Sequence, residues 1–133
     1  MSRASVCLPC LLLFVAVTAG CGTSADRDQA RAAASTLYAA AERHDGATAC
    51  AQMSPSLRAQ LVDDHGSPCA EAVLKVKLHG RTPTTIRVYA DAAEVQFAGG
   101  DTVFLGDTRE GWRVEALGCR SQGPGPYECE EQA

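Results

Sequence analysis

The sequence predicts an α+β domain: N-terminal helices packed on a curved four-stranded antiparallel sheet, preceded by a signal peptide. Three observations predict it. Residues 8–17 are an apolar run followed by small residues and a cysteine. Apolar residues then recur at helical spacing as far as residue 74, and beyond Pro83 they recur at every second residue, as in strands. The length of 133 residues leaves room for one small domain after the signal.

The first segment predicts export. Arg3 is its only charge, and the apolar run is shorter than the roughly 20 residues that span a bilayer. This pattern is typical of a secretory signal, so residues 1–20 are excluded from the fold. The stretch Thr18-Ala19-Gly20-Cys21 resembles the lipobox of bacterial lipoproteins, although that motif usually has Leu where Thr18 stands. Cleavage after Ala19 and plain secretion is therefore the alternative.

The resemblance implies that Cys21 carries a thioether-linked diacylglycerol and an N-acyl group, which together give the chains that stable anchoring needs. The expected location is the outer face of the cytoplasmic membrane. Residues 21–26 are small and polar, which predicts a flexible tether after the lipidated cysteine. The folded domain is then expected to span residues 27–133.

Composition excludes one class of partner. Without residues 1–20, 11 basic and 16 acidic residues remain, a net charge of −5, so nucleic acid is not an expected partner. Aromatic residues make up only 5% of the chain, so the core must consist mainly of Ala, Val and Leu. A core of this kind is marginal for a small domain without further stabilisation.

Cysteine is expected to supply that stabilisation. Cys50, Cys69, Cys119 and Cys129 remain after Cys21 is lipidated, and an even number in an oxidising compartment predicts disulfides. Three pairings are possible, and the local one, Cys50–Cys69 with Cys119–Cys129, is favoured. Each bond would stabilise the fold by about 2–3 kcal/mol. The mature chain has no C-x-x-C pair and no paired His spacing, so no metal or other cofactor is expected.

The strongest helix is predicted over residues 25–43. It is rich in Ala, and acids near its start, Asp26 and Asp28, suit the helix dipole. His44-Asp45-Gly46 is expected to end it, with the glycine supplying the turn. Its apolar stripe consists of Ala30, Ala34, Leu37, Tyr38 and Ala41.

Three shorter helices are expected next. One covers residues 47–53, and two begin at the Ser-Pro pairs of residues 54–55 and 67–68, where Ser can cap and Pro can open a helix. Their predicted buried residues are Leu57, Leu61 and Val62 in one and Ala70, Val73 and Leu74 in the other.

Four strands follow, over residues 86–89, 93–97, 102–105 and 112–116. Apolar and polar residues alternate in them, and Gly99-Gly100-Asp101 is a hairpin signal between the middle two. A meander of this kind needs a cover on one face, which the helices can provide. Gly123-Pro124-Gly125-Pro126 predicts an irregular tail tied back by Cys129.

Short motifs in this order resemble small actinobacterial lipoproteins of the NTF2-like (cystatin-like, SnoaL-type) superfamily. They are the run Tyr38 to Gly46, Cys50-Ala51, Ser54-Pro55, Pro68 to Ala72, Asp101 to Leu105 and Gly111 to Val114. The resemblance implies a cone-shaped fold with a pocket between the sheet and the long helix. It implies no single activity, because the superfamily contains isomerases, cyclases, hydrolases and non-catalytic binding domains.

Catalysis in such a pocket would need a carboxylate base facing a Tyr or a protonated acid. The candidates are Glu94 with Tyr38 or Tyr89, but Glu94 is out of phase with its apolar neighbours and is expected to face solvent. His44 and His65 stand at helix ends and His79 in a loop, so turns are the expected role of these three residues.

The sequence therefore favours a non-catalytic, lipid-anchored binding module for a small apolar ligand or an envelope protein. The alternatives are an isomerase- or hydratase-like enzyme that uses the same pocket, and a purely structural envelope subunit. The residues expected to line the pocket are Tyr38, Val95, Phe97, Phe104 and Trp112.

Overall fold

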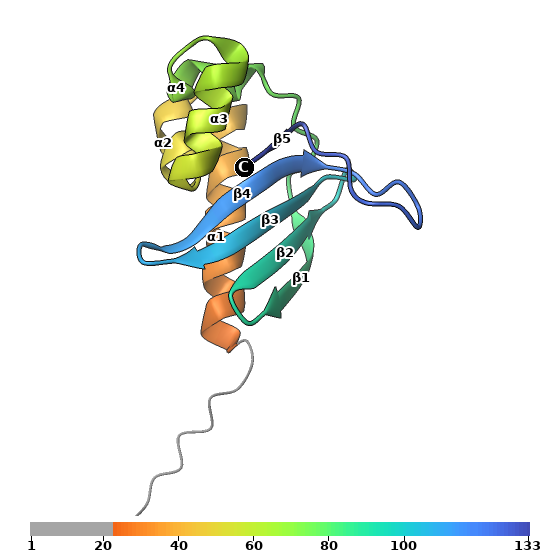
Figure 1. The fold of residues 1–133 in the computed structure, drawn as a ribbon. Coiled ribbons are helices and arrows are strands. Elements are labelled where there is room, and N and C mark those ends of the chain that lie inside the picture. Colours follow the sequence, from red (N-terminus) through yellow and green to blue (C-terminus); the bar gives the residue numbers. More distant parts are fainter. Residues whose placement is uncertain (1–22) are drawn as a thin grey trace, which may run out of the picture.

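The structure is a computed structural model that describes residues 23–133, so the signal segment and Cys21 lie outside the described residues. Helices come first and an antiparallel sheet follows, which confirms the predicted α+β class (Figure 1). The helical elements are α1 (Ser24–Glu42), α2 (Gly46–Ala51), α3 (Pro55–His65), α4 (Cys69–Ala72) and the 3-10 turn η1 (Val73–Lys75). The strands are β1 (Pro83–Tyr89), β2 (Ala92–Phe97), β3 (Thr102–Thr108), β4 (Gly111–Cys119) and β5 (Glu131–Gln132).

Helix α1 begins earlier than predicted because Thr23 caps it. The Thr23 hydroxyl accepts a hydrogen bond from the Asp26 backbone N–H at 3.2 Å, and the Asp26 carboxylate accepts one from the Thr23 backbone N–H at 2.8 Å. This reciprocal pair is a capping box. Residues 23–26, which the sequence placed in a flexible tether, therefore form the cap and first turn of the helix. Residues 23–26 therefore belong to the folded domain, which was predicted to start at residue 27.

The turn after α1 also differs from the prediction. His44 takes the left-handed conformation (φ 58°), and Asp45 caps α2 by accepting a hydrogen bond from the Thr48 backbone N–H at 3.1 Å. Gly46 is already the first residue of α2. A Cβ at this position would lie 1.7 Å from the Ala70 carbonyl oxygen, so the glycine allows α4 to pack against the start of α2.

Helices α2, α3 and α4 gather beside the C-terminal half of α1 (Figure 1). Leu57 and Leu61 of α3 are fully buried, as predicted. Val62 and Leu74 were also predicted to be buried, but they are 39% and 38% exposed. Val62 lies about 100° further around α3 than Leu61, and the change from α-helix to 3-10 turn at Val73 turns Leu74 away from the core.

A short extended segment ties this helical cluster to the sheet. The Ser54 backbone N–H donates to the Val114 carbonyl, and the Val114 N–H donates to the Gln52 carbonyl, both at 2.9 Å. The Ser54 hydroxyl also accepts a hydrogen bond from the Leu57 N–H at 3.2 Å, which caps α3 as predicted. The start of α3 is therefore fixed directly on β4.

Within residues 23–133 the sheet has five strands in the order β1-β2-β3-β4-β5, all antiparallel, and it is not closed. The first four contain the predicted strands. The fifth corrects the predicted count of four, because part of the tail expected to be irregular pairs with β4 through Glu131 opposite Leu117. The Cys119–Cys129 disulfide holds this tail close to β4, which makes the pairing possible.

The core lies between α1 and the inner face of the sheet (Figure 1). Most of the α1 residues in it are alanines, whose small side chains let the helix lie close to the strands. No helix within residues 23–133 has the length and apolar content needed to cross a membrane. The core residues of α1 and the strands include Ala30, Ala34, Leu37, Val95, Val103, Leu105 and Val114.

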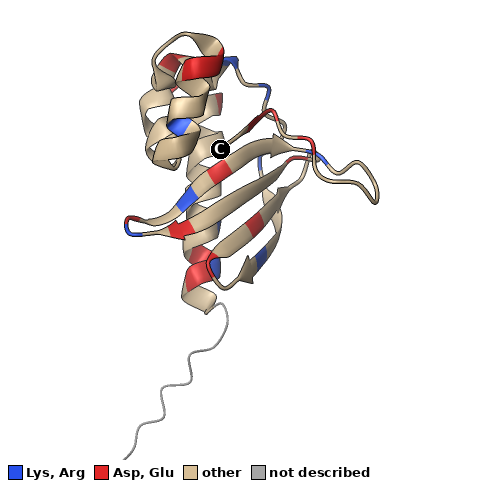
Figure 2. Ribbon diagram, in the orientation of Figure 1, with Lys and Arg blue, Asp and Glu red and all other residues tan. Residues whose placement is uncertain are grey.

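The outer face of the sheet, away from α1, carries charged side chains (Figure 2). Arg87 donates to Glu94 Oε1 at 3.1 Å, and Gln96 donates to the same oxygen at 2.6 Å. Phe104 lies on this face too, edge-on to Tyr127 with ring centroids 5.1 Å apart. This face therefore combines charged side chains with a partly buried aromatic ring.

Candidate functional site

A hollow of about 310 Å³ opens beside the C-terminal end of α1, where the segment between η1 and β1 passes the helix. Glu42 and Arg81 pair across its rim at 2.9 Å. The apolar walls are Ala41, Val73, Leu74, Val76 and Leu78. The polar lining consists of Tyr38, Glu42, His44, His79 and Arg81.

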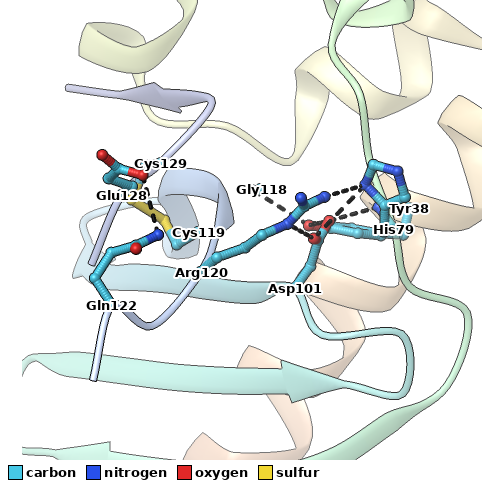
Figure 3. A network of polar contacts seen from close by, with 9 residues as sticks. All are labelled: Tyr38, His79, Asp101, Gly118, Cys119, Arg120, Gln122, Glu128 and Cys129. Atoms are coloured by element: carbon cyan, nitrogen blue, oxygen red, sulfur yellow. Dashed lines mark hydrogen bonds and ion pairs between the residues drawn. A yellow bond between two sulfur atoms is a disulfide. The ribbon is translucent and has the colours of Figure 1, made fainter.

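Tyr38 reaches the base of the hollow because it lies on the buried stripe of α1. Its ring stacks on Phe97 with centroids 4.3 Å apart. The phenol donates to Asp101 Oδ2 at 3.1 Å and accepts a hydrogen bond from the Gly118 backbone N–H at 3.3 Å (Figure 3). Burial, followed by the negative charge of Asp101, raises the pKa of the Tyr38 phenol well above its usual range, so the O–H group stays a donor.

Asp101 is the most deeply buried acid near the hollow, with an exposed fraction of 0%. It follows Gly99 and Gly100, whose positive φ angles of 113° and 102° let the chain turn sharply before β3. Its Oδ2 also accepts a hydrogen bond from the His79 backbone N–H at 2.6 Å. Its Oδ1 lies 3.5 Å from Arg120 Nε as an ion pair and has no hydrogen-bond partner. The guanidinium therefore supplies the charge that a buried carboxylate requires.

Arg120 extends this group towards the surface. Its guanidinium also donates to His79 Nδ1, so the imidazole carries its proton on Nε2 (Figure 3). Its side chain is 47% exposed, and that of His79 is 53% exposed. We call Tyr38, His79, Asp101 and Arg120 the Asp101 cluster. It joins α1, the segment before β1, the β2–β3 turn and the end of β4.

The cluster presents only part of its chemistry to the hollow. Tyr38 and His79 line the hollow, whereas Asp101 does not. Tyr38 is only 4% exposed, and its hydroxyl group and the His79 imidazole are already hydrogen bonded within the cluster. The carboxylate is covered and paired. The accessible lining is more polar than apolar, so the hollow suits a small molecule that carries polar groups beside an apolar part.

The candidate catalytic pairs of the sequence are not assembled. Glu94 lies on the outer face of β2, paired with Arg87, as its phase in the strand predicts. Tyr89 is 55% exposed at the β1–β2 turn. The acid that faces Tyr38 is Asp101, which the sequence placed only in a hairpin.

The five predicted pocket residues do not line one cavity. Tyr38 lines the hollow, and Val95 and Phe97 are buried in the core beside it. Trp112 is 3% exposed and borders a separate, shallower hollow of about 240 Å³ beside α1. Phe104 points the other way, because it alternates with the buried Val103 and Leu105 and so lies on the outer face.

Two of the three histidines have contacts beyond the turns in which they were predicted. His65 Nε2 and Glu131 Oε1 lie 2.7 Å apart, which connects the end of α3 to β5. His79 belongs to the Asp101 cluster. His44 does form the predicted turn, and it also borders the hollow.

The two predicted disulfide pairings are confirmed. Cys50–Cys69 joins α2 to α4, and Cys119–Cys129 closes the loop that begins next to Arg120 (Figure 3). Cys21, the expected lipidation site, lies outside the described residues. Within residues 23–133 no group of three or more His, Cys, Asp or Glu side chains is placed to hold a metal ion.

Comparisons of the chain with protein-family models, with curated proteins and with solved structures found no match. The candidate site is therefore defined by the residues of the hollow and of the Asp101 cluster.

Proposed function

We propose that this chain is an extracytoplasmic lipoprotein, anchored through Cys21, whose NTF2-like domain binds a small, partly apolar ligand. The observation that carries the proposal is the hollow beside α1, which is lined by both apolar and polar side chains and has the buried Asp101 behind Tyr38. At about 310 Å³ it lies at the lower end of the range for small-molecule sites. A short aliphatic chain with one polar end suits this space.

Two features support the location. Disulfides persist in oxidising compartments, and the described residues contain Cys50–Cys69 and Cys119–Cys129. The apolar run of residues 8–17 and the small residues before Cys21 supply the export signal. Mass spectrometry of the membrane-extracted chain tests this part: diacylglycerol on Cys21 is expected, whereas an unmodified chain that begins at Gly20 would indicate secretion.

The NTF2-like assignment draws support from the order of elements. Helices precede an antiparallel meander, and the long helix α1 crosses one face of that sheet (Figure 1). The hollow lies at one end of this helix-and-sheet interface, beside the place where the resemblance implies a pocket. A crystal structure of the mature chain would test the assignment through the curvature of the sheet.

Binding can be tested with octanoate as the probe, followed by amide chemical shifts of the mature chain. Shifts are expected in residues 38–44 and 73–81, the two segments that contain the lining residues. Val76→Lys places a charge in the apolar wall and is expected to abolish them. Val62→Lys, on the exposed side of α3, is the matched control and should leave them unchanged. If the shifts persist in the Val76→Lys variant, or if the unmodified chain shows no shifts, there is no ligand site in this hollow. An envelope protein would then be the alternative partner.

One observation favours the second candidate, a small isomerase- or hydratase-like enzyme: His79, whose side chain is half exposed, is one of the residues that line the hollow. Such an enzyme would move a proton next to a carbonyl group. Exchange of the α-protons of 2-octanone in D₂O, followed by NMR, tests this. An exchange rate above the rate in buffer would favour the enzyme if the His79→Ala variant loses this increase. An exchange rate equal to that in buffer would favour the binding module.

A further inference from the structure

The first turn of α1 lies at one end of the domain, near the β1–β2 turn of the sheet (Figure 1). The Trp112 indole N–H approaches Asp26 Oδ1 at 3.5 Å, which ties the start of the helix to β4. Trp112 pairs with Asp107, whose backbone N–H donates to the Asp91 carbonyl at 2.8 Å. The β1–β2 turn therefore belongs to the same end. We call residues 23–26 and 89–92 the proximal end.

The proximal end is also the end nearest to Cys21. Successive Cα atoms are 3.8 Å apart, so the two peptide units between Cys21 and Thr23 can span at most about 7 Å. Thr23 already caps α1 and hydrogen bonds to Asp26, so no flexible tether follows it. A lipid on Cys21 would therefore hold the first turn of α1 at the surface of the membrane.

We propose that the proximal end rests on the anchoring bilayer, with Tyr89 at the level of the lipid headgroups, so that the hollow opens towards the aqueous side. This inference depends on the proposed lipid anchor and adds an orientation to it. Tyr89 is 55% exposed, the largest exposed fraction among the big apolar side chains of the described residues. Tyrosine favours the membrane interface because its ring is apolar and its hydroxyl group is polar.

The charge of the proximal end indicates what kind of contact this is. Residues 23–26 and 89–92 contain no Lys or Arg, and their two charged residues are the acids Asp26 and Asp91. A polybasic segment would bind anionic lipids and would detach at high salt. The contact here comes from the anchor and the tyrosine, so it should form on neutral lipid and persist in salt.

The orientation also determines where the ligand comes from. The hollow is lined by Ala41, Glu42 and His44 at the far end of α1. At 1.5 Å per residue, Glu42 lies about 27 Å along the helix from Ser24. A helix that stands on its first turn therefore holds the hollow well outside the bilayer, and its ligand arrives through the aqueous envelope and not from the lipids that hold the anchor.

The test uses the full lipidated chain in phosphatidylcholine nanodiscs that contain a headgroup nitroxide lipid, read by amide NMR. Paramagnetic broadening should remove most of the amide signal of residues 23–26 and 89–92. The signals of residues 41–44 and 73–81 should keep their intensity, which provides an internal control. Tyr89→Ala is expected to restore the signals of residues 89–92, whereas Val62→Ala, a matched change on exposed α3, should alter nothing.

The orientation and the anchor are tested separately, because mass spectrometry of the same sample shows whether Cys21 carries lipid. If Cys21 carries lipid but the signals around the hollow are broadened, or all signals are broadened equally, the orientation is wrong and the anchor is still supported. Loss of the broadening in high salt would overturn the role of Tyr89 in favour of charge. An unmodified Cys21 would overturn both proposals.

Discussion

The two ends of α1 are held by different kinds of polar contact. At the first turn, Thr23 and Asp26 bond to each other, three residues apart and exposed to water. Near the other end, Tyr38 bonds to Asp101 and Gly118, which are 63 and 80 residues away in the chain, in a buried setting. The first set stabilises one helix end locally, whereas the second set holds the helix, the β2–β3 turn and β4 together.

This difference has an energetic consequence. Exposed polar contacts compete with water and contribute little, whereas a buried polar group that loses its partner costs the full penalty of desolvation. Changes at the Asp101 cluster should therefore affect the whole domain, and changes at the cap should affect only the start of α1. The predictions below test this ranking.

Asp101→Ala should have the largest effect, a loss of about 2–5 kcal/mol in the free energy of unfolding, because it leaves both the Tyr38 phenol and the His79 backbone N–H without their acceptor. Urea unfolding measures it. Asp63→Asn, which changes an exposed acid of α3, is the control and should stay close to the unchanged chain. An equally small effect of both substitutions would mean that the cluster does not hold the segments together.

The disulfides come next. Replacing both cysteines of either bond with Ala should lower the free energy of unfolding by about 3 kcal/mol, because each bond closes a loop of similar entropy cost. The two variants should differ in location: loss of Cys50–Cys69 should raise amide hydrogen exchange in α2 and α4, and loss of Cys119–Cys129 should raise it in β5 and around Arg120. If both variants showed the same pattern of amide exchange, the two disulfides would not stabilise separate parts of the domain.

Tyr38→Phe should cost about 1–3 kcal/mol, less than Asp101→Ala. It removes one donor to Asp101 and the acceptor of the Gly118 N–H, but it keeps the ring that stacks on Phe97. Thermal unfolding measures the loss. The double variant with Asp101→Ala should lose less free energy of unfolding than the sum of the two single losses, because both changes remove the same hydrogen bond. Full additivity would show that the phenol and the carboxylate act independently.

The same contrast explains how much could be read from the sequence. The α+β class, the four main strands and the outward phase of Glu94 follow from periodicity, which reports local geometry. The local pairing of Cys50 with Cys69 and of Cys119 with Cys129 was also correct, because short loops close at low entropy cost.

The Asp101 cluster was missed because no local pattern encodes it. Asp101 follows two glycines and is typical of a turn residue, and only the tertiary fold brings Arg120 and Tyr38 to it. Phe104 was misplaced for a simpler reason: it alternates with Val103 and Leu105, so the pattern already put it on the opposite face. The short strand β5 depends on the Cys119–Cys129 bond and has only two residues of its own.

The smallest effect is expected at the proximal end. Thr23→Ala removes the capping hydroxyl group and should cost about 1 kcal/mol, seen as faster amide exchange in the first turn of α1 with no change around Tyr38. Thr23→Ser, which keeps the hydroxyl group, is the matched control. If Thr23→Ala instead raised exchange across the whole domain, the cap would be part of the cooperative core and the contrast between the two ends would fail.

The cap should also respond to pH. The Thr23 hydroxyl group and then the Thr23 backbone N–H lower the pKa of Asp26 below its ordinary value of 3.8, because both donate to the carboxylate. A folded-state pKa below the unfolded one means that the stabilisation is present above about pH 4 and is lost as the pH falls through the folded value. Removing the hydroxyl group removes the larger of the two causes. Between pH 5 and pH 2 the Thr23→Ala chain should therefore lose less stability than the unchanged chain, as urea unfolding at each pH can measure, and an equal loss would show that another acid governs this range.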